Sequence, residues 1–154
     1  MSGLQQRIGK VGQEYAAVAL RSLGVEMVEK IGTPVILIKT KTPGVFRVIF
    51  EETVSGDHHG ILPGGRYVLA ETKTVFDRNL VWSDFRDHQP TALTKHAELG
   101  GVALVVWVNS SGSHVMRWPI PGFGPGKGIT PEQARRMEVT RSDIERWRCY
   151  ERST

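Results

Sequence analysis

Two short runs decide the fold of this chain: Ser55-Gly56-Asp57-His58-His59-Gly60 and, nine residues later, Leu69-Ala70-Glu71-Thr72-Lys73. An aspartate beside glycines is followed by Glu-x-Lys at the end of an apolar segment, with a Gly-Gly turn between them. Side chains alternate along a strand, so Glu71 and Lys73 should point to the same face. Carboxylate oxygens are the hard ligands that Mg²⁺ prefers. The two runs therefore predict a metal site held by Asp57 and Glu71, with Lys73 beside the ion.

Such a site could hydrolyse a phosphodiester. A bound metal neutralises charge on the phosphate and lowers the pKa of a bound water. The carbonyl of Thr72 is a plausible third ligand, and Lys73 could orient the water or stabilise the developing charge. Glu14 lies in a predicted helix and could reach the same ion, directly or through water, if that helix packs across the sheet.

Each motif also has an ordinary structural explanation. Aspartate is favoured in a glycine-flanked turn because it hydrogen-bonds locally. Glu-x-Lys on a strand is often only a solvated face. The order of the motifs, the Gly-Gly turn between them and the flanking apolar strand together favour the metal site.

The 154 residues suggest one domain with a real core. The net charge of +4 fits a polyanionic partner. Cys149 is the single cysteine, which excludes an internal disulfide and indicates a reducing compartment. The N-terminus lacks the apolar segment of a secretory signal, and the longest apolar run, residues 102–108, is too short to cross a bilayer. We therefore expect a cytoplasmic location and no membrane partner.

The first half of the chain predicts a helix and three strands. Apolar residues recur at helical spacing over residues 4–23, and Gly24 should end that helix. Residues 35–38, 45–53 and 66–73 are β-rich and separated by turns, which predicts an antiparallel meander.

The second half predicts one more helix and a buried strand. A helix should occupy the later part of residues 82–100, with Pro90 in its first turn. Residues 102–108 are apolar on both faces, as in the middle of an α/β sheet. A loop at 109–113, a strand at 114–118 and an irregular stretch at 119–128 should follow. Thr130 and Thr140 should each cap a helix, the last one ending near Tyr150. We expect a single domain over residues 1–154, with a core at about 4–118 and a C-terminal helical extension at about 129–151.

Other possible sites are weaker. Adjacent histidines at 58 and 59 point oppositely on an extended chain and have no matching His or Cys cluster, which disfavours zinc. Residues 110–113 lack the Gly-x-Ser-x-Gly elbow of a serine hydrolase. Residues 122–128 lack the spacing of a phosphate loop and fit better as a basic loop against a nucleic-acid backbone. The C-terminal arginines fit either intrahelical ion pairs or DNA contact.

The ordered motifs resemble those of the PD-(D/E)XK nuclease fold. Within it, they are similar to the Holliday-junction resolvases, both the RecU type of Gram-positive bacteria and the archaeal type. The resemblance spans roughly Gly9 to Val108. The motifs that carry it are Gly9 to Glu14 in the first helix, Asp57-His58-His59-Gly60, Gly65 to Thr74, and His88-Gln89 followed by Leu93 and Gly100-Gly101-Val102-Ala103.

The resemblance implies an α/β, restriction-endonuclease-like fold, with a mixed central sheet flanked by helices. It also implies a homodimer with two Mg²⁺-dependent sites, each nicking one of two opposing strands of a four-way DNA junction. Mn²⁺ should be able to replace Mg²⁺. Gln89 would lie near the scissile phosphate and hold the water or Lys73. Contacts to the DNA should be mainly to phosphates, and the candidates are Arg7, Lys10, Arg66 and Lys95.

The chain also departs from the resolvases. The RecU type carries a stalk inserted between early strands, and we expect no long stalk here. Residues after Trp118 match no motif of the family. These departures are compatible with a phage-encoded protein acting in a bacterial host. Two alternatives stay open: another nuclease of the same fold acting on linear or branched DNA, and a non-catalytic DNA-binding protein that keeps the fold.

Overall fold

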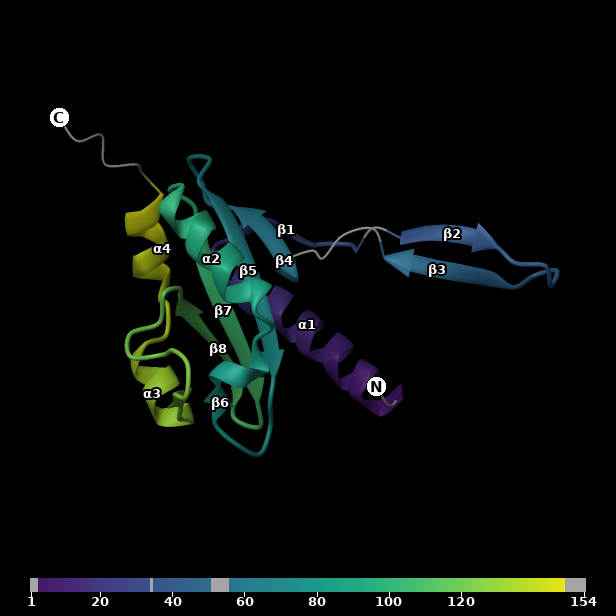
Figure 1. Ribbon diagram of the computed structural model, residues 1–154. Helices are drawn as coiled ribbons and strands as arrows, with labels where there is room; N and C mark the ends of the chain where they lie inside the picture. Colours follow the sequence, from purple (N-terminus) through teal and green to yellow (C-terminus); the bar gives the residue numbers. More distant parts are fainter. Residues whose placement is uncertain (1–2, 34, 51–55, 149–154) are drawn as a thin grey trace.

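The computed structural model describes residues 3–33, 35–50 and 56–148 (Figure 1). Its elements are, in chain order, α1 (Gly3–Leu23), β1 (Glu26–Lys30), β2 (Val35–Lys39), β3 (Phe46–Phe50), β4 (His58–Ile61), β5 (Tyr67–Thr74), β6 (Leu80–Val81), the 3₁₀ helix η1 (Trp82–Asp84), α2 (His88–Glu98), β7 (Val102–Asn109), β8 (Gly112–Arg117), β9 (Gly128–Ile129), α3 (Pro131–Arg136) and α4 (Arg141–Trp147).

Five strands form the central sheet, in the order β1-β4-β5-β7-β8. The pair β5–β7 is parallel, and the other neighbours are antiparallel. Every residue of β7 is buried, because helices cover both faces of the sheet where it lies. The predictions of a mixed α/β sheet and of a strand covered on both sides at 102–108 are therefore confirmed.

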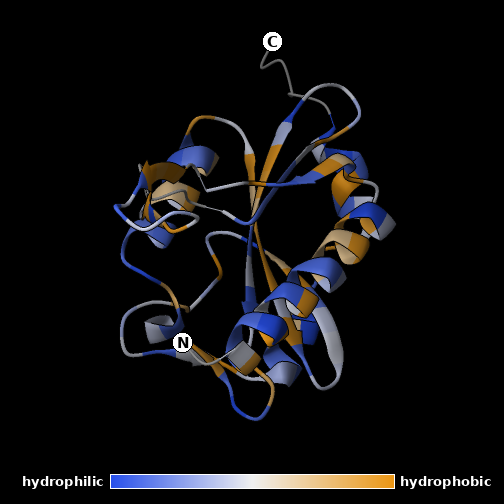
Figure 2. Ribbon diagram, turned by 90° about the vertical axis from the view of Figure 1, so that its right-hand side faces the viewer, coloured by the Kyte–Doolittle hydropathy of each residue, from blue (hydrophilic) through white to orange (hydrophobic). Residues whose placement is uncertain are grey.

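The core is divided by the sheet into two apolar clusters. On one face, Ala16 and Leu20 of α1 pack against Val68 and Ala70 of β5. On the other face, Leu93 of α2 packs with residues that include Leu69, Phe85, Trp107 and Trp118. Figure 2 shows hydrophobic residues along the central strands between these helices. Alternation along β5 thus sends even-numbered residues toward α1 and odd-numbered residues toward α2.

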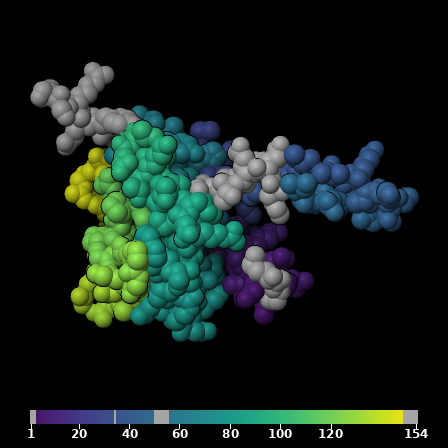
Figure 3. Space-filling view, viewed as in Figure 1, coloured from purple at the N-terminus to yellow at the C-terminus, as the bar shows by residue number. Residues whose placement is uncertain are grey.

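The predicted meander is wrong in its first two strands. β2 and β3 pair only with each other, and they form a hairpin that projects from the body of the protein (Figures 1 and 3). The predicted strand residues 51–53 lie outside the described residues. The early strands of the sheet are instead β1 and β4. β-propensity identifies extended segments but not the sheet that they join.

This hairpin is an insertion between the early strands β1 and β4. The sequence predicts no long stalk at this place, and the insertion found there is a hairpin of two five-residue strands. Neither β1 nor β4 was predicted from the sequence. β1 has the sequence Glu-Met-Val-Glu-Lys and buries a single residue, Val28. β4 has the sequence His-His-Gly-Ile.

Most of the local predictions are confirmed. Gly24 ends α1 with a φ of 101°, and Pro90 lies in the first turn of α2. Thr130 and Thr140 cap α3 and α4 by accepting hydrogen bonds from the backbone of Gln133 and Asp143. The predicted loop at 109–113 is shorter than expected, because β7 ends at Asn109 and β8 starts at Gly112. Among the described helices, none has the length and apolar character needed to span a bilayer.

Candidate active site

A cleft of about 1090 Å³ opens where the C-terminal half of β5 meets α1 and the start of α2. Asp57, Glu71, Thr72, Lys73 and Gln89 all line it. The structure therefore brings together five of the residues that the sequence predicts for the site, although they come from three separate parts of the chain.

Glu71 and Lys73 share one face of β5, as strand alternation predicts. Both point to the α2 side, where Lys73 Nζ lies 4.8 Å from the ring centroid of Phe85. Lys73 Nζ is 2.9 Å from Glu71 Oε1. Glu71 is only 2% exposed, so this ion pair stands at the bottom of the cleft and not on a solvated surface.

Asp57 is held beside β5 by its backbone and by both carboxylate oxygens. Its amide donates to Ala70 O over 2.8 Å. Oδ2 accepts from the Thr72 amide at 2.8 Å, and Oδ1 accepts from Gln13 Nε2 at 2.9 Å. These bonds place the Asp57 carboxylate next to the Glu71-Thr72 segment.

Gln89 connects Glu71 with Lys73. Its Nε2 donates to Glu71 Oε1 at 2.5 Å, and its Oε1 accepts from Lys73 Nζ at 2.7 Å. The Arg86 amide also donates to Oε1, over 2.9 Å. Two donors fix which end of the amide is the oxygen, so Gln89 holds the lysine and the glutamate in a defined arrangement.

The electrostatics of the pair suit a cation. Burial raises the pKa of Glu71, and the negative charge of Asp57 raises it further, while Lys73 acts in the opposite direction. Two carboxylates that repel each other in a buried position are stabilised by a positive ion between them. Among the described residues, no group of three Asp, Glu, His or Cys side chains is arranged to hold a metal. Asp57 and Glu71 could thus hold Mg²⁺ only with help from water and a backbone oxygen, such as the carbonyl of Thr72.

Gln13, and not Glu14, is the residue of α1 that reaches Asp57. Gln13 lines the cleft, whereas Glu14 does not line it and instead lines the adjoining groove between α1 and β1, which Gln13 also borders. The prediction is that Glu14 reaches the ion directly or through water; its place outside the cleft does not support a direct contact, and Gln13 is the residue that bonds to Asp57. The physical reason is the phase of the helix, since one residue turns the side chain by about 100°.

Gly12 allows α1 to lie against the end of β5. A Cβ at this position would stand 1.9 Å from Thr74 Oγ1. The inward face of α1 is marked by Gly12, Ala16 and Leu20, all buried. This stripe of small and apolar residues is the sequence signal that could have identified Gln13 as a neighbour of the sheet.

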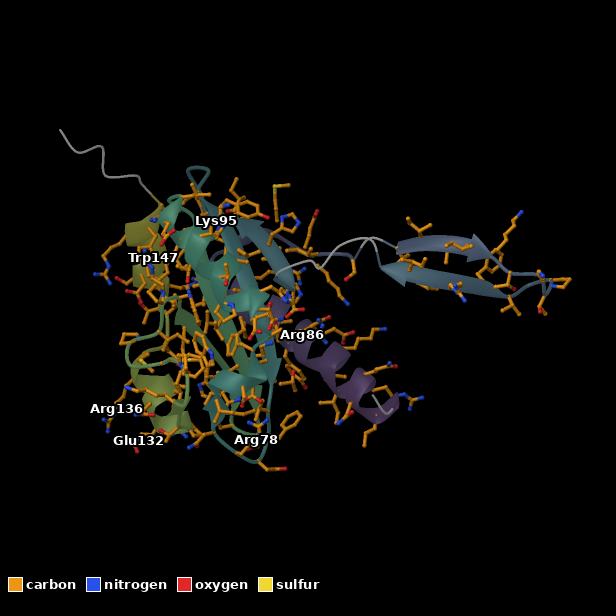
Figure 4. The ribbon with its side chains drawn as sticks, viewed as in Figure 1. Arg78, Arg86, Lys95, Glu132, Arg136 and Trp147 are labelled. Carbon is orange, nitrogen blue, oxygen red and sulfur yellow. The ribbon has the colours of Figure 1, made fainter. Side chains whose placement is uncertain are left out.

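The predicted DNA contacts lie outside the cleft. Arg7 and Lys10 are exposed on α1. Arg66 donates through Nε to Gly100 O over 2.7 Å and through a terminal nitrogen to Trp147 O over 3.4 Å, at the end of β5 away from Lys73. Lys95 lies near the C-terminal end of α2, the end farther from Arg86 (Figure 4).

Other cations line the cleft and were not predicted: Lys30, Arg78 and Arg86. Arg78 is paired with Asp84 through two hydrogen bonds of 2.8 and 2.6 Å. Their positions follow from the packing of β1 and of the β5–α2 connection, which no local pattern reveals.

Three of the C-terminal arginines form intrahelical or near-helical ion pairs. Arg136 pairs with Glu132, Arg146 with Asp143, and Arg148 with Glu145. These exposed contacts match the first of the two explanations for the arginine-rich segment.

The family model of recombination protein U, RecU, matches residues 8–119. The chain belongs to the RecU family. This family comprises Holliday junction resolvases of the restriction-endonuclease-like fold, so the resemblance of the motifs is confirmed. The match includes every residue of the Asp57–Glu71–Lys73–Gln89 cluster and excludes α3 and α4. No curated protein matches the chain.

Proposed function

We propose that this protein is a metal-dependent endodeoxyribonuclease that resolves four-way DNA junctions by paired, symmetric nicks. The observation that carries the proposal is the bonded cluster of Asp57, Glu71, Lys73 and Gln89 at the bottom of one cleft. We propose the four-way junction as the substrate because the chain belongs to the RecU family, which acts in recombination.

In this proposal, Asp57 and Glu71 hold Mg²⁺, or Mn²⁺ in its place, with the Thr72 carbonyl as a further ligand. When bound, such an ion would supply charge neutralisation at the scissile phosphate and would lower the pKa of a water. The other residues position the reacting groups. Gln13 and the Thr72 amide keep the Asp57 carboxylate in place, and Gln89 does the same for Glu71 and Lys73.

The ammonium group of Lys73 is the cation closest to the proposed metal ligands among the groups described. It can orient the attacking water or stabilise the charge that develops on the phosphate oxygens. Hydrolysis then adds water across one P–O bond and leaves a phosphate monoester and a hydroxyl group. The Lys73 side chain is only 13% exposed, and its Nζ lies over the Phe85 ring. Its charge interactions are therefore stronger than those of a solvated lysine.

The rim of the cleft can hold the DNA backbone. Lys30, Arg78 and Arg86 line it, and cations at such positions bind phosphates without reading sequence. Arg7 and Lys10 on α1 would contact the DNA backbone beside the cleft. Arg66 and Lys95, at the other end of the body, would contact DNA only as it leaves the cleft.

A homodimer is part of the proposal. A four-way junction presents two equivalent strands, and two-fold symmetry of the protein would bring one cleft to each of them. A single chain has one cluster of Asp57, Glu71 and Lys73, which cuts one strand.

Cleavage of an end-labelled four-way junction tests the function. The same assay should include a linear duplex of the same sequence and a splayed arm, each with Mg²⁺ and with EDTA. We expect Mg²⁺-dependent nicks on the junction and none by Asp57→Asn. Equal cutting of the linear duplex would contradict junction selectivity, and failure to cut any substrate would contradict the assignment as a nuclease.

A further inference from the structure

A second cavity, of about 360 Å³, lies between α1 and β1. We call it the α1–β1 groove, and its walls include Lys10, Ala17, Val18, Arg21 and Val28. Its size is within the range of pockets that bind small organic ligands. No residue of the metal-ligand pair lines it, so it is distinct from the catalytic cleft.

The groove nevertheless continues from the cleft. Gln13 and Lys30 line both cavities, and His58 in the groove directly follows Asp57 in the chain. A DNA strand with one phosphate at Asp57 and Glu71 could therefore extend past Gln13 into the groove.

The rim of the groove is cationic. Lys10, Arg21 and Lys30 contribute three positive charges, and Glu14 contributes one negative charge. Arg21 donates from a terminal nitrogen to Val28 O over 3.1 Å, which holds its guanidinium group at this rim. An anion such as a phosphate group is attracted here, and the Glu14 carboxylate remains available to accept a hydrogen bond.

The interior has a different character. Ala17, Val18 and Val28 supply apolar walls. His58 is 3% exposed, and its Nδ1 has no hydrogen-bond partner among the described residues. A buried polar atom without a partner is costly and uncommon in native proteins. Apolar walls with isolated polar groups suit a flat heterocycle, and phosphate alone would leave these walls unused.

We infer that the α1–β1 groove binds one unstacked nucleotide of the DNA strand, with its phosphate near Lys10 and Arg21 and its base against Val18 and Val28. The inference rests on the proposed function for the presence of DNA. A base enters such a pocket only after leaving its stack, and the cost is lowest where the base is already unpaired. The groove thus selects a strand with disrupted pairing beside the scissile phosphate.

Titration of the 154-residue protein with small ligands tests this inference. In EDTA and at constant ionic strength, thymidine 5′-monophosphate, inorganic phosphate and thymidine are each followed by backbone amide NMR shifts. We expect shifts in residues of α1, β1 and His58, with the nucleotide binding several-fold more tightly than either fragment. Equal affinity for nucleotide and phosphate would overturn the base-binding role, and shifts confined to other regions would overturn the location.

Three variants sharpen the test. Lys10→Gln should weaken nucleotide binding about threefold to fivefold, as expected for one exposed charge contact. Val18→Trp fills the groove from an exposed helix position and should abolish nucleotide shifts while keeping a folded spectrum. Lys41→Gln makes the same charge change in the β2–β3 turn and should leave binding unchanged. Equal affinities in Lys10→Gln and Lys41→Gln, or wild-type binding by Val18→Trp, would overturn the inference.

Cleavage of the four-way junction separates this inference from the proposed function. If wild-type protein cuts no DNA but nucleotide binding in the groove behaves as expected, the nuclease proposal fails and the groove stands. If wild-type protein resolves junctions and Val18→Trp does so at the same rate and affinity, the groove inference fails and the nuclease stands.

Discussion

Gln13 Nε2 donates a hydrogen bond to Asp57 Oδ1 over 2.9 Å and so joins α1 to the start of β4. The carboxylate would otherwise be held on its other oxygen by the Thr72 amide alone. Gln13 therefore fixes the rotation of the Asp57 side chain, although it supplies no charge of its own. Its role is that of a positioning residue.

Gln13→Ala should lower the single-turnover rate on a four-way junction by roughly fivefold to tenfold, since one net hydrogen bond contributes about 1 kcal/mol. It should also raise the Mg²⁺ concentration needed for half-maximal rate, because Asp57 is less well oriented. Gln6→Ala, at an exposed position of the same helix, is the matched control. Equal rates and equal Mg²⁺ dependence in the two variants would rule out the positioning role.

Lys73→Ala should reduce the chemical step by about 10²-fold to 10³-fold, as for other groups that stabilise a transition-state charge. Junction affinity should change little, because other cations line the rim of the cleft. Lys73→Arg should not restore the rate, since the guanidinium fork does not replace a compact ammonium between Gln89 and Glu71. Rapid-quench cleavage at saturating protein measures this. A rate close to that of Lys39→Ala, an exposed lysine of the hairpin, would remove Lys73 from the mechanism.

The stability of the metal-free protein should depend on the ionisation of Glu71. Burial and Asp57 raise its pKa above the ordinary value of 4.5, so the folded state binds more protons than the unfolded state in that interval. Stability therefore falls as pH rises from 4.5 through the raised pKa. Glu71→Gln cannot titrate at this position.

Thermal unfolding in EDTA over a series of pH values measures this effect. The Tm of the wild-type protein minus that of Glu71→Gln should decrease as pH rises through the window. Glu71→Gln also removes the ion pair between Glu71 and Lys73, which adds an offset to the Tm difference. The slope of the Tm difference against pH is therefore the informative quantity. A difference that does not change with pH would show that Glu71 titrates normally. Excess Mg²⁺ should raise the wild-type Tm at neutral pH and leave that of Glu71→Gln nearly unchanged.

Gly12→Ala should destabilise the protein by about 1–3 kcal/mol, because overpacking at a close contact forces the backbone apart. The added Cβ would stand 1.9 Å from Thr74 Oγ1. Gly9→Ala is the control on the same helix, where a Cβ meets no atom within 4 Å and should stabilise by roughly 0.5–1 kcal/mol.

Urea unfolding of these variants gives the two free energies. Adding Thr74→Ala to Gly12→Ala should recover part of the loss, since it removes the atoms that the new Cβ would meet. Equal stability of Gly12→Ala and Gly9→Ala would contradict the close approach of α1 to β5.

Local patterns were sufficient for the chemistry that lies along one strand. Alternation placed Glu71 and Lys73 on one face, and the continuous apolar run identified β7 as a strand that is covered on both faces. Local patterns failed where the position of a side chain depends on packing between segments. The choice between Gln13 and Glu14 depends on which face of α1 meets the sheet, and the glycine and alanine stripe sets that face.

Local sequence patterns also did not predict the first two strands of the sheet, β1 and β4. β1 and β4 are short, polar and carry few β-forming residues. They become strands because β1 pairs with β4 and β4 pairs with β5. The apolar hairpin β2–β3 has the stronger β pattern and yet stays outside the sheet. Lys30, Arg78 and Arg86 meet at the cleft only through this tertiary arrangement.

Paired cleavage by a dimer is tested by mapping both cuts on one four-way junction whose two opposing strands carry different dyes. The assay uses wild-type protein, Asp57→Asn and a mixture of the two. We expect symmetric Mg²⁺-dependent nicks on both strands by the wild type, none by the variant, and an excess of single nicks by the mixture. Wild-type cutting by Asp57→Asn, or nicks that appear equally on a linear duplex, would contradict it.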